Sequence, residues 1–210
     1  MKQVIATPSQ TKAILQSYGM AARKSYGQNF LIDAGIVEKI ARSAIVSDHC
    51  AVLEIGPGIG PLTVQLARRA GKVAAIELDR SLLPILDETL APYDNVTVIP
   101  GDAMKLDLAA LAAEQFPGLT PLACANLPYN ITTPVLTALI EAGCFRAITV
   151  MIQREVALRI CAAPGTADYG AFSLFCQYHT VPEFLFEVPP ECFLPAPKVT
   201  SAVIRLTPRD

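Results

Sequence analysis

The amino-acid sequence predicts an α/β fold with a mainly parallel sheet, helices on both of its faces and a C-terminal β-hairpin at one edge. Three observations support this prediction. Short apolar runs alternate along the chain with amphipathic segments, and the first of these runs ends in a glycine-rich turn. Near the C-terminus, two strand-like segments follow one another with only a proline-rich loop between them. Alternating strands and helices are typical of parallel sheets, whereas two consecutive strands are typical of a hairpin.

The N-terminal part of the chain has the weakest pattern. Residues 1–32 mix polar and apolar types without a clean period, which indicates a partly mobile arm. The first helix is expected after Asp33, whose side chain is placed to cap it. The apolar positions of this helix recur at steps of three and four residues, at Ile36, Val37, Ile40, Ala41 and Ala44.

Five apolar runs then predict the parallel strands, at residues 51–55, 73–77, 96–99, 122–125 and 149–153. Helices are expected between them at residues 62–67, with a stop at Gly71, and at residues 82–90 and 106–113. A further helix is expected to open at Thr133 and Pro134, because proline is favoured at the first helical position. Residues 183–188 and 199–206 are the expected hairpin strands. No linker marks an internal boundary, so residues 1–210 are expected to form one domain.

The composition is that of a globular protein. Of the 210 residues, 52% are hydrophobic and 17% are charged, which is enough to bury a large core. No apolar run is long enough to span a bilayer and no secretory segment follows Met1, so we expect a soluble, cytoplasmic protein. The six cysteines form no CxxC pair, and together with only two histidines they do not make a metal site. We therefore expect reduced thiols and no metal.

The net charge of −2 does not by itself favour a nucleic-acid partner, because phosphate binding normally needs a basic face. The placement of the charges nevertheless leaves a one-sided basic surface open. Lys12, Arg23 and Lys24 lie near the N-terminus without nearby acids, and further basic residues follow at Arg154, Arg159 and Lys198.

Candidate site residues lie directly after the expected strands, where open α/β sheets bind their ligands. The first motif follows the strand at 51–55 and contains Gly56, Gly58 and Gly60. Glycines allow a ligand to approach the backbone closely, although a lone glycine triplet is equally typical of a tight strand-to-helix turn. The G-x-G-x-G spacing differs from the G-x-G-x-x-G of dinucleotide sites. It therefore favours S-adenosyl-L-methionine over a nicotinamide cofactor.

Acidic residues follow the next two strands. Glu77 comes roughly twenty residues after the glycine loop, and is placed to accept hydrogen bonds from both hydroxyls of a ribose. Asp79 is expected to be an ordinary exposed acid. Asp102 is placed to accept a hydrogen bond from the adenine amine of the cofactor, although by itself it is more typical of a turn or a helix cap.

The most specific motif is Asn126-Leu127-Pro128-Tyr129, directly after the strand at 122–125. A neutral adenine amine is a poor nucleophile because its lone pair is delocalised into the ring. The amide oxygen of Asn126 and the carbonyl oxygen of Leu127 are placed to accept hydrogen bonds from such an amine, which frees the lone pair. Pro128 stiffens the turn, and Tyr129 offers a flat surface on which a base can stack. An Asx-turn with a buried tyrosine is the weaker interpretation.

These residues resemble a known family. The tetrapeptide at 126–129 is similar to the (N/D/S)-P-P-(Y/F) motif of amino-methylating enzymes, and more narrowly to the NLPY form of the 16S ribosomal RNA adenine dimethyltransferases. Two further segments resemble motifs of that family, Gly27-Gln28-Asn29-Phe30-Leu31 and Gln153-Arg154-Glu155-Val156. Residues 193–203, F-L-P-A-P-K-V-T-S-A-V, resemble a third. The resemblance runs from about Lys24 to the end of the sequence.

The resemblance implies a Rossmann-like class I S-adenosylmethionine-dependent methyltransferase fold. It also implies dimethylation of the N6 amine of adenines in 16S rRNA, within the small ribosomal subunit, by a monomer. Members of the family normally have a small helical C-terminal domain, which we expect to be absent here, and glycine where this chain has Ala125. The residues expected to bind the cofactor are Gln28, Asn29, Leu31, Gly56, Gly58, Gly60, Glu77, Asp102, Ala103 and Asn126. Those expected to act on the base are Asn126, Leu127, Pro128, Tyr129 and Phe193, with Phe193 stacking on the adenine opposite Tyr129.

Three alternatives stay open. Macrolide-resistance methyltransferases, which act on large-subunit RNA, resemble this chain but usually read NIPY, so Leu127 favours the small-subunit enzyme. A ribosome-assembly factor could keep the fold without catalysis, but the intact 126–129 motif argues against binding alone. A nicotinamide oxidoreductase is the third alternative, and the glycine spacing argues against it.

Overall fold

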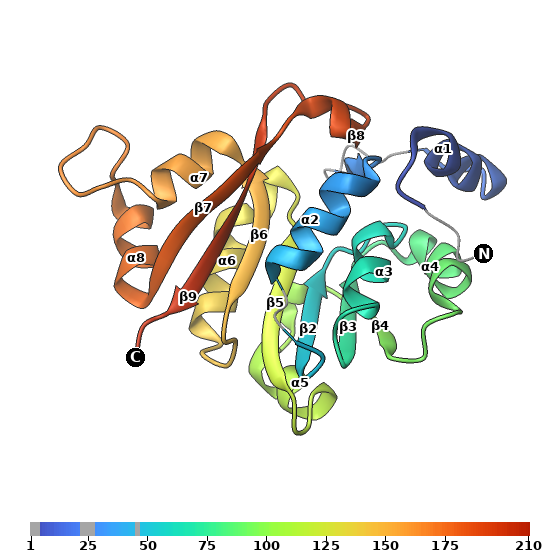
Figure 1. Cartoon of the computed structure of the whole chain (residues 1–210), viewed down its shortest axis with the longest axis horizontal. Helices are drawn as coiled ribbons and strands as arrows, with labels where there is room; N and C mark the ends of the chain where they lie inside the picture. The colour runs from blue at the N-terminus through green and yellow to red at the C-terminus, as the bar shows by residue number, and fades with distance from the viewer. Residues whose placement is uncertain (1–4, 22–27, 45–46) are drawn as a thin grey trace.

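The computed structural model describes residues 5–21, 28–44 and 47–210. In this part of the chain, a seven-stranded sheet has the order β4-β3-β2-β5-β6-β9-β7 (Figure 1). Its parallel strands are β2 (Cys50–Ile55), β3 (Lys72–Glu77), β4 (Val96–Pro100), β5 (Thr120–Asn126) and β6 (Ile148–Gln153). The chain runs outward from β2 to β4 and then returns to the other side of β2 with β5. The strand order therefore reverses between β2 and β5, which is where such sheets bind ligands.

The two remaining strands of this sheet, β7 (Thr180–Val188) and β9 (Ser201–Pro208), are antiparallel. β9 lies between β6 and β7, so the predicted hairpin at one edge is confirmed. β9 begins at Ser201, because Val199 lies in an exposed bend before it. The α/β class is also confirmed, and the five parallel strands begin and end within two residues of the predicted positions.

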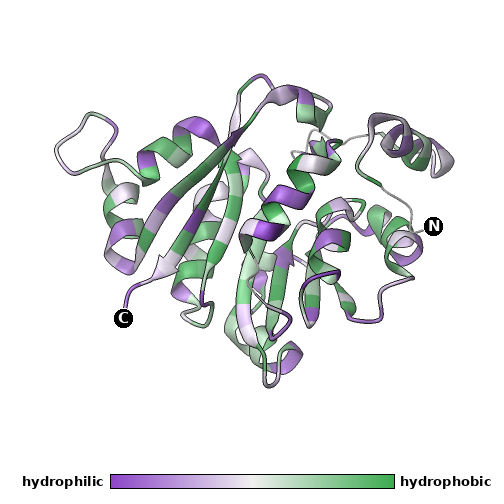
Figure 2. Ribbon diagram, in the orientation of Figure 1, coloured by the Kyte–Doolittle hydropathy of each residue, from purple (hydrophilic) through white to green (hydrophobic). Residues whose placement is uncertain are grey.

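Helices cover both faces of the sheet (Figures 1 and 2). One face packs against α2 (Ala34–Ala44), α3 (Pro61–Ala67) and α4 (Leu83–Leu90). The other packs against α5 (Leu108–Gln115), α6 (Thr132–Glu141), α7 (Arg154–Ile160) and α8 (Ala171–His179). In β2, Leu53 packs toward the second group and Val52 toward the first, because successive side chains of a strand point to opposite faces. Burying each such side chain contributes about 1.5–3 kcal/mol.

The N-terminal segment contains a helix that the sequence pattern did not predict. α1 (Pro8–Ser17) is capped by the side chain of Thr7, which accepts a hydrogen bond from the amide of Gln10. Leu15 packs in a cluster with residues of η2 (Arg80–Leu82) and α4, and the Tyr18 hydroxyl donates to Glu88. The interpretation as a mobile arm is therefore corrected for residues 5–21. The helix buries few side chains, so its periodic signal is weak.

Several helix boundaries also differ from the predicted ones. α3 ends at Ala67, so Gly71 is not its stop. Glycine is needed at position 71 because a Cβ atom there would lie 2.4 Å from the backbone oxygen of Asp48. α6 begins at Thr132, which makes Pro134 its third residue. α7 and α8 were not predicted. Asp33 caps α2 as expected, accepting from the amide of Ile36 at 3.0 Å.

Two short strands connect distant parts of the sequence. β1 (Phe30–Leu31) and β8 (Phe193–Leu194) form an antiparallel pair, and the amide of Ile32 donates to the Cys192 carbonyl. In the part of the chain that the structure describes, no helix is long and apolar enough to cross a membrane. The six cysteines are free thiols, and the described residues contain no cluster of acids, histidines or cysteines that could hold a metal ion.

Candidate active site

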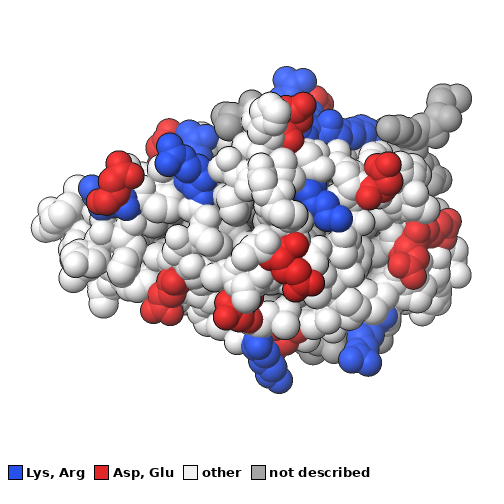
Figure 3. Space-filling view, turned by 90° about the horizontal axis from the view of Figure 1, so that it is seen from below, with Lys and Arg blue, Asp and Glu red and all other residues white. Residues whose placement is uncertain are grey.

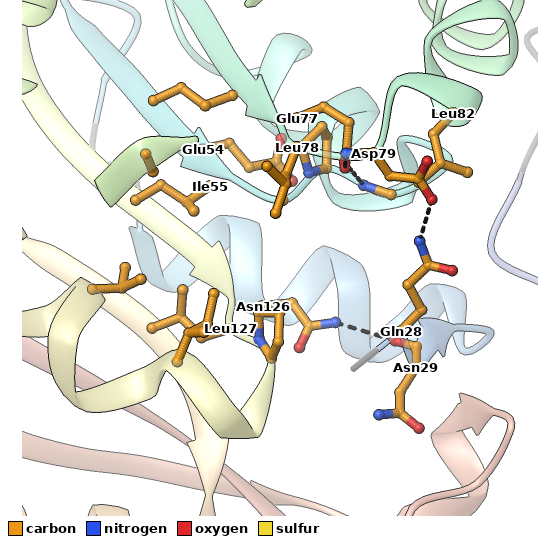
Figure 4. Close-up of a pocket in the computed structure, with 18 of the residues that line it drawn as sticks. Gln28, Asn29, Glu54, Ile55, Glu77, Leu78, Asp79, Leu82, Asn126 and Leu127 are labelled. Atoms are coloured by element: carbon orange, nitrogen blue, oxygen red, sulfur yellow. Dashed lines mark hydrogen bonds between the residues drawn. The ribbon is translucent and has the colours of Figure 1, made fainter. Parts of the chain in front are cut away.

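A pocket opens at the carboxyl ends of β2, β3 and β5, at the point where the strand order reverses (Figure 4). Its lining combines the segment around β1 with the loops that follow the strands. Of the sequence-predicted residues, it contains Gln28, Asn29, Leu31, Gly56, Gly58, Glu77, Asp102, Ala103, Asn126, Leu127, Pro128, Tyr129 and Phe193. Gly27, part of one of the motifs, lies outside the described residues.

The glycine loop has the left-handed backbone that glycine favours. Gly56, Gly58 and Gly60 have φ values of 72°, 62° and 96°. Gly56 lines the pocket, and a Cβ atom added there would meet nothing within 4 Å, so its α-carbon faces open space. Gly60 is not part of the lining. It precedes α3 and packs against α4, where a Cβ atom would lie 3.2 Å from the Thr89 hydroxyl oxygen.

Glu77 is held in place by backbone amides. Its Oε1 accepts from the amide of Asp79 at 2.8 Å, and its Oε2 accepts from the amide of Gly58 at 3.2 Å. Burial raises the pKa of Glu77 to about 6, although these backbone hydrogen bonds oppose the shift. The carboxylate thus joins the glycine loop to the end of β3.

Asp79 is not the exposed acid that the sequence suggested. It is 2% exposed and lines the pocket. Its Oδ2 accepts from the side-chain amide of Gln28 at 2.9 Å, and its Oδ1 accepts from the amide of Ser81 at 3.0 Å (Figure 4). Asp79 therefore fastens the N-terminal segment to the edge of the pocket.

Asp102 is a helix cap, one of the two roles expected from the sequence. Its Oδ1 accepts from the amide of Met104 at 3.0 Å and so caps the short helix η3 (Ala103–Lys105). Asp102 also lines the pocket, together with Ala103. The cap fixes the direction of the carboxylate.

The 126–129 loop is braced at several points. The amide of Leu127 donates to the carbonyl of Met151 in β6 at 3.1 Å, and the Thr132 hydroxyl donates to the carbonyl of Pro128 at 3.3 Å. The Asn126 side chain donates through Nδ2 to the carbonyl of Asn29 at 3.5 Å (Figure 4). With the amide group in this orientation, its Oδ1 is the atom left to act as an acceptor.

Two aromatic residues line the same pocket from different parts of the sequence. Tyr129 is half-buried in the turn after β5, where it begins the short helix η4 (Tyr129–Ile131). Phe193 is buried in β8, where it pairs with Leu31. Ala125 is buried in the core beneath the sheet and is not part of the lining, so its methyl group does not narrow the pocket.

Glu54, Leu78 and Met104 are among the pocket residues that the sequence did not predict. Glu54 is buried, and burial raises its pKa to about 8, with a smaller contribution from the charge of Glu77. Within the described part of the chain, its Oε2 has no hydrogen-bond partner. Leu78 and Met104 line the pocket as exposed apolar side chains. Leu78 directly follows Glu77, and Met104 lies two residues after Asp102. These positions beside predicted site residues were the only sign in the sequence that the two side chains line the pocket.

Within the described part of the chain, two of the basic residues named above are paired with acids. Arg154 is paired with Glu187, and Arg159 with Glu155. Arg23 and Lys24 lie outside the described residues. The face shown in Figure 3 carries acidic and basic side chains interspersed with each other.

The chain is similar to known proteins over nearly all of its length. A family model described as ribosomal RNA adenine dimethylase matches residues 19–210. A ribosomal RNA small subunit methyltransferase A from Geobacillus sp. (strain WCH70) is 50% identical over 211 residues, which cover 100% of this chain and 72% of the relative. The protein of the same name from Levilactobacillus brevis is 51% identical over 208 residues, covering 98% of this chain and 70% of the relative.

Two solved structures are also similar to this chain. A dimethyladenosine transferase from Plasmodium falciparum has a TM-score of 0.75 and 31% identity, with 86% of this chain and 63% of that chain covered. The 23S rRNA methyltransferase ErmE has a TM-score of 0.75 and 30% identity, with 86% and 70% covered. The fold is therefore that of the class I methyltransferases. Because the family model spans more than half of the chain and the relatives share half of its residues, the chain belongs to the ribosomal RNA adenine dimethylase family.

Proposed function

We propose that this chain transfers methyl groups from S-adenosyl-L-methionine to the N6 amine of adenines in small-subunit ribosomal RNA, two to each target adenine. The observation that carries the proposal is the meeting of the 126–129 loop with Glu77, Asp102 and the glycine loop in one pocket. The half-identical relatives, which are named small-subunit methyltransferases, support the choice of RNA. We also infer that the protein acts in the cytoplasm as a monomer.

The pocket residues fit S-adenosyl-L-methionine. Gly56 leaves open space beside the backbone, and Glu77 presents a carboxylate that can accept from ribose hydroxyls. Asp102 can accept from an adenine amine, with the apolar side chains of Leu78 and Met104 beside the ring. When bound, the cofactor supplies an electrophilic methyl group on a sulfonium.

The 126–129 loop orients and activates the adenine amine, which is the nucleophile. Asn126 Oδ1 and the Leu127 carbonyl oxygen accept hydrogen bonds from the two N–H groups of the amine. These acceptors draw the nitrogen toward tetrahedral geometry and make its lone pair available. Because the amide of Leu127 is tied to β6 and Asn126 is tied to Asn29, the acceptors need little reorganisation during the reaction.

The aromatic residues hold the base. An adenine that leaves its stack loses a few kcal/mol. Stacking on Tyr129 and Phe193 offsets this loss and brings the amine to the acceptors. A monomethylated amine still has one N–H group to donate, so the same acceptors can orient it for the second transfer.

The test is methyl transfer from isotopically labelled S-adenosyl-L-methionine to small ribosomal subunits that lack adenine methylation. Mass spectrometry of the nucleosides is expected to show N6,N6-dimethyladenosine. Large ribosomal subunits serve as the matched control, and transfer to them alone would favour a large-subunit enzyme. Cofactor binding without any transfer would instead indicate that this chain only binds.

A further inference from the structure

The 126–129 loop is joined to the C-terminal strand by one side-chain contact. The Tyr129 hydroxyl and the Ser201 Oγ share a hydrogen bond of 2.6 Å, although 72 residues separate them in the sequence. Tyr129 lines the pocket, whereas Ser201 does not. The contact therefore connects a pocket residue to a residue outside the pocket.

Ser201 is a rigid anchor. It is fully buried at the first position of β9, where it pairs with Gln153 of β6 on one side and Val188 of β7 on the other. The carbonyl of the preceding residue, Thr200, accepts from the amide of Arg154 at 2.9 Å. A hydroxyl on such a backbone has little freedom to move.

Tyr129 is held less firmly. Its backbone lies in a turn between β5 and α6, and the Tyr129 ring is only half-buried. The loop contacts at Leu127 and Pro128 restrain the backbone but do not touch the Tyr129 ring. Rotation about the χ1 bond would swing the ring across the pocket, and the hydrogen bond at the far end of the phenol opposes that rotation.

We propose that Ser201 is a positioning residue, which holds the ring of Tyr129 in the orientation that receives the target adenine. This inference rests on the proposed function, because an orientation matters only if a base stacks on the ring. The inference assigns a role to Ser201, which belongs to the motif at residues 193–203 but does not itself line the pocket.

The inference predicts an effect on turnover rather than on cofactor binding. In Ser201→Ala, kcat is expected to fall about tenfold, because misplacing a base by a fraction of an ångström disturbs its approach to the methyl group. The Kd for S-adenosylhomocysteine is expected to stay unchanged. Tyr129→Phe keeps the stacking ring and removes the same hydrogen bond, so it is expected to lose the same factor. The double variant is expected to lose no more than either single variant.

Thr149→Val is the matched control. Thr149 is a buried residue of β6, and its hydroxyl has no hydrogen-bond partner within the described part of the chain. Removing this hydroxyl changes the same sheet without touching Tyr129. An equal loss of kcat in Thr149→Val and Ser201→Ala would overturn the inference, because the loss would then reflect damage to the sheet.

A second measurement does not depend on turnover. Ring-labelled tyrosine gives an NMR signal for Tyr129, identified by its disappearance in Tyr129→Phe. The signal is expected to shift and change width in Ser201→Ala but not in Thr149→Val. An unchanged signal, or a Ser201→Ala enzyme with the kcat of the parent, would overturn the inference. Failure of the proposed function is distinguishable, because the parent chain itself would then transfer no methyl group.

Discussion

Leu31 lies directly opposite Phe193 in the two-stranded sheet formed by β1 and β8. Leu31 belongs to the segment proposed to hold the cofactor, and Phe193 is proposed to stack on the base. Both residues line the same pocket. The cofactor and the adenine are therefore expected to contact a single hydrogen-bonded unit, so that a shift of this unit would change both sites together.

Phe193 provides the first prediction. Phe193→Leu keeps an apolar side chain in β8 but removes the aromatic face. The rate of methyl transfer is expected to fall about tenfold, because stacking contributes about 1–3 kcal/mol per base. The cofactor affinity of this variant, measured by calorimetry, is expected to equal that of the parent. Phe116→Leu is the control, since Phe116 is equally buried but lies outside the pocket. A similar loss of rate in both variants would contradict a stacking role.

Asn126→Ala is expected to lower kcat by about 100-fold or more while the thermal midpoint stays close to that of the parent. The substitution removes the acceptor for the adenine amine and a single long hydrogen bond to Asn29. Asn126→Asp keeps an oxygen acceptor and is expected to retain measurable transfer. Near-normal turnover by Asn126→Ala would remove the proposed role.

Gly56→Ala is expected to weaken cofactor binding by about tenfold or more. The added methyl group would enter the space that the cofactor needs, and the positive φ would cost about 1 kcal/mol of stability. Gly118→Ala is a matched control, because Gly118 has a φ of 76° and open surroundings but does not line the pocket. Calorimetric titration with S-adenosylhomocysteine measures the cofactor affinity of the Gly56→Ala and Gly118→Ala variants. Equal affinities would show that the Gly56 space is not used.

Glu54 predicts a pH dependence of stability. Its pKa rises from 4.5 to about 8 on folding, so between these values the folded protein holds a proton that the unfolded chain releases. The unfolding free energy of the ligand-free protein is therefore expected to fall as the pH rises from about 5 to 8.

Glu54→Gln is expected to flatten this slope and to stabilise the protein at pH 8 by a few kcal/mol, since each pKa unit corresponds to about 1.4 kcal/mol. Urea unfolding at several pH values measures the effect. The exposed Glu114→Gln is the control and should keep the parent slope. If Glu54→Gln kept that slope as well, the buried carboxyl would not be its source.

The sequence predicted the parallel strands well because each is a short, mainly apolar run, and all of them except β4 are largely buried. All of the predicted site residues except Gly60 line the pocket, since the loops after neighbouring parallel strands meet at one edge. The sequence could not predict the β1–β8 pair, because two-residue strands have no period and their register depends on the packing of distant segments. The burial of Asp79 depends on Gln28, which lies 51 residues earlier and contacts it only in the folded chain.

The position of β9 has a consequence for the order in which the protein can fold during its own synthesis. Residues 201–208 follow β6 and β7 in the sequence, yet they lie between these two strands in the sheet. Until they emerge, β6 has an open edge and β7 has no strand to pair with. Ser201 belongs to the same strand, so the Tyr129 ring can form its hydrogen bond to Ser201 only after β9 has been made. During synthesis the loops after β2, β3 and β4 can thus form before Ser201 is present, whereas the Tyr129 side of the pocket is complete only once β9 is inserted.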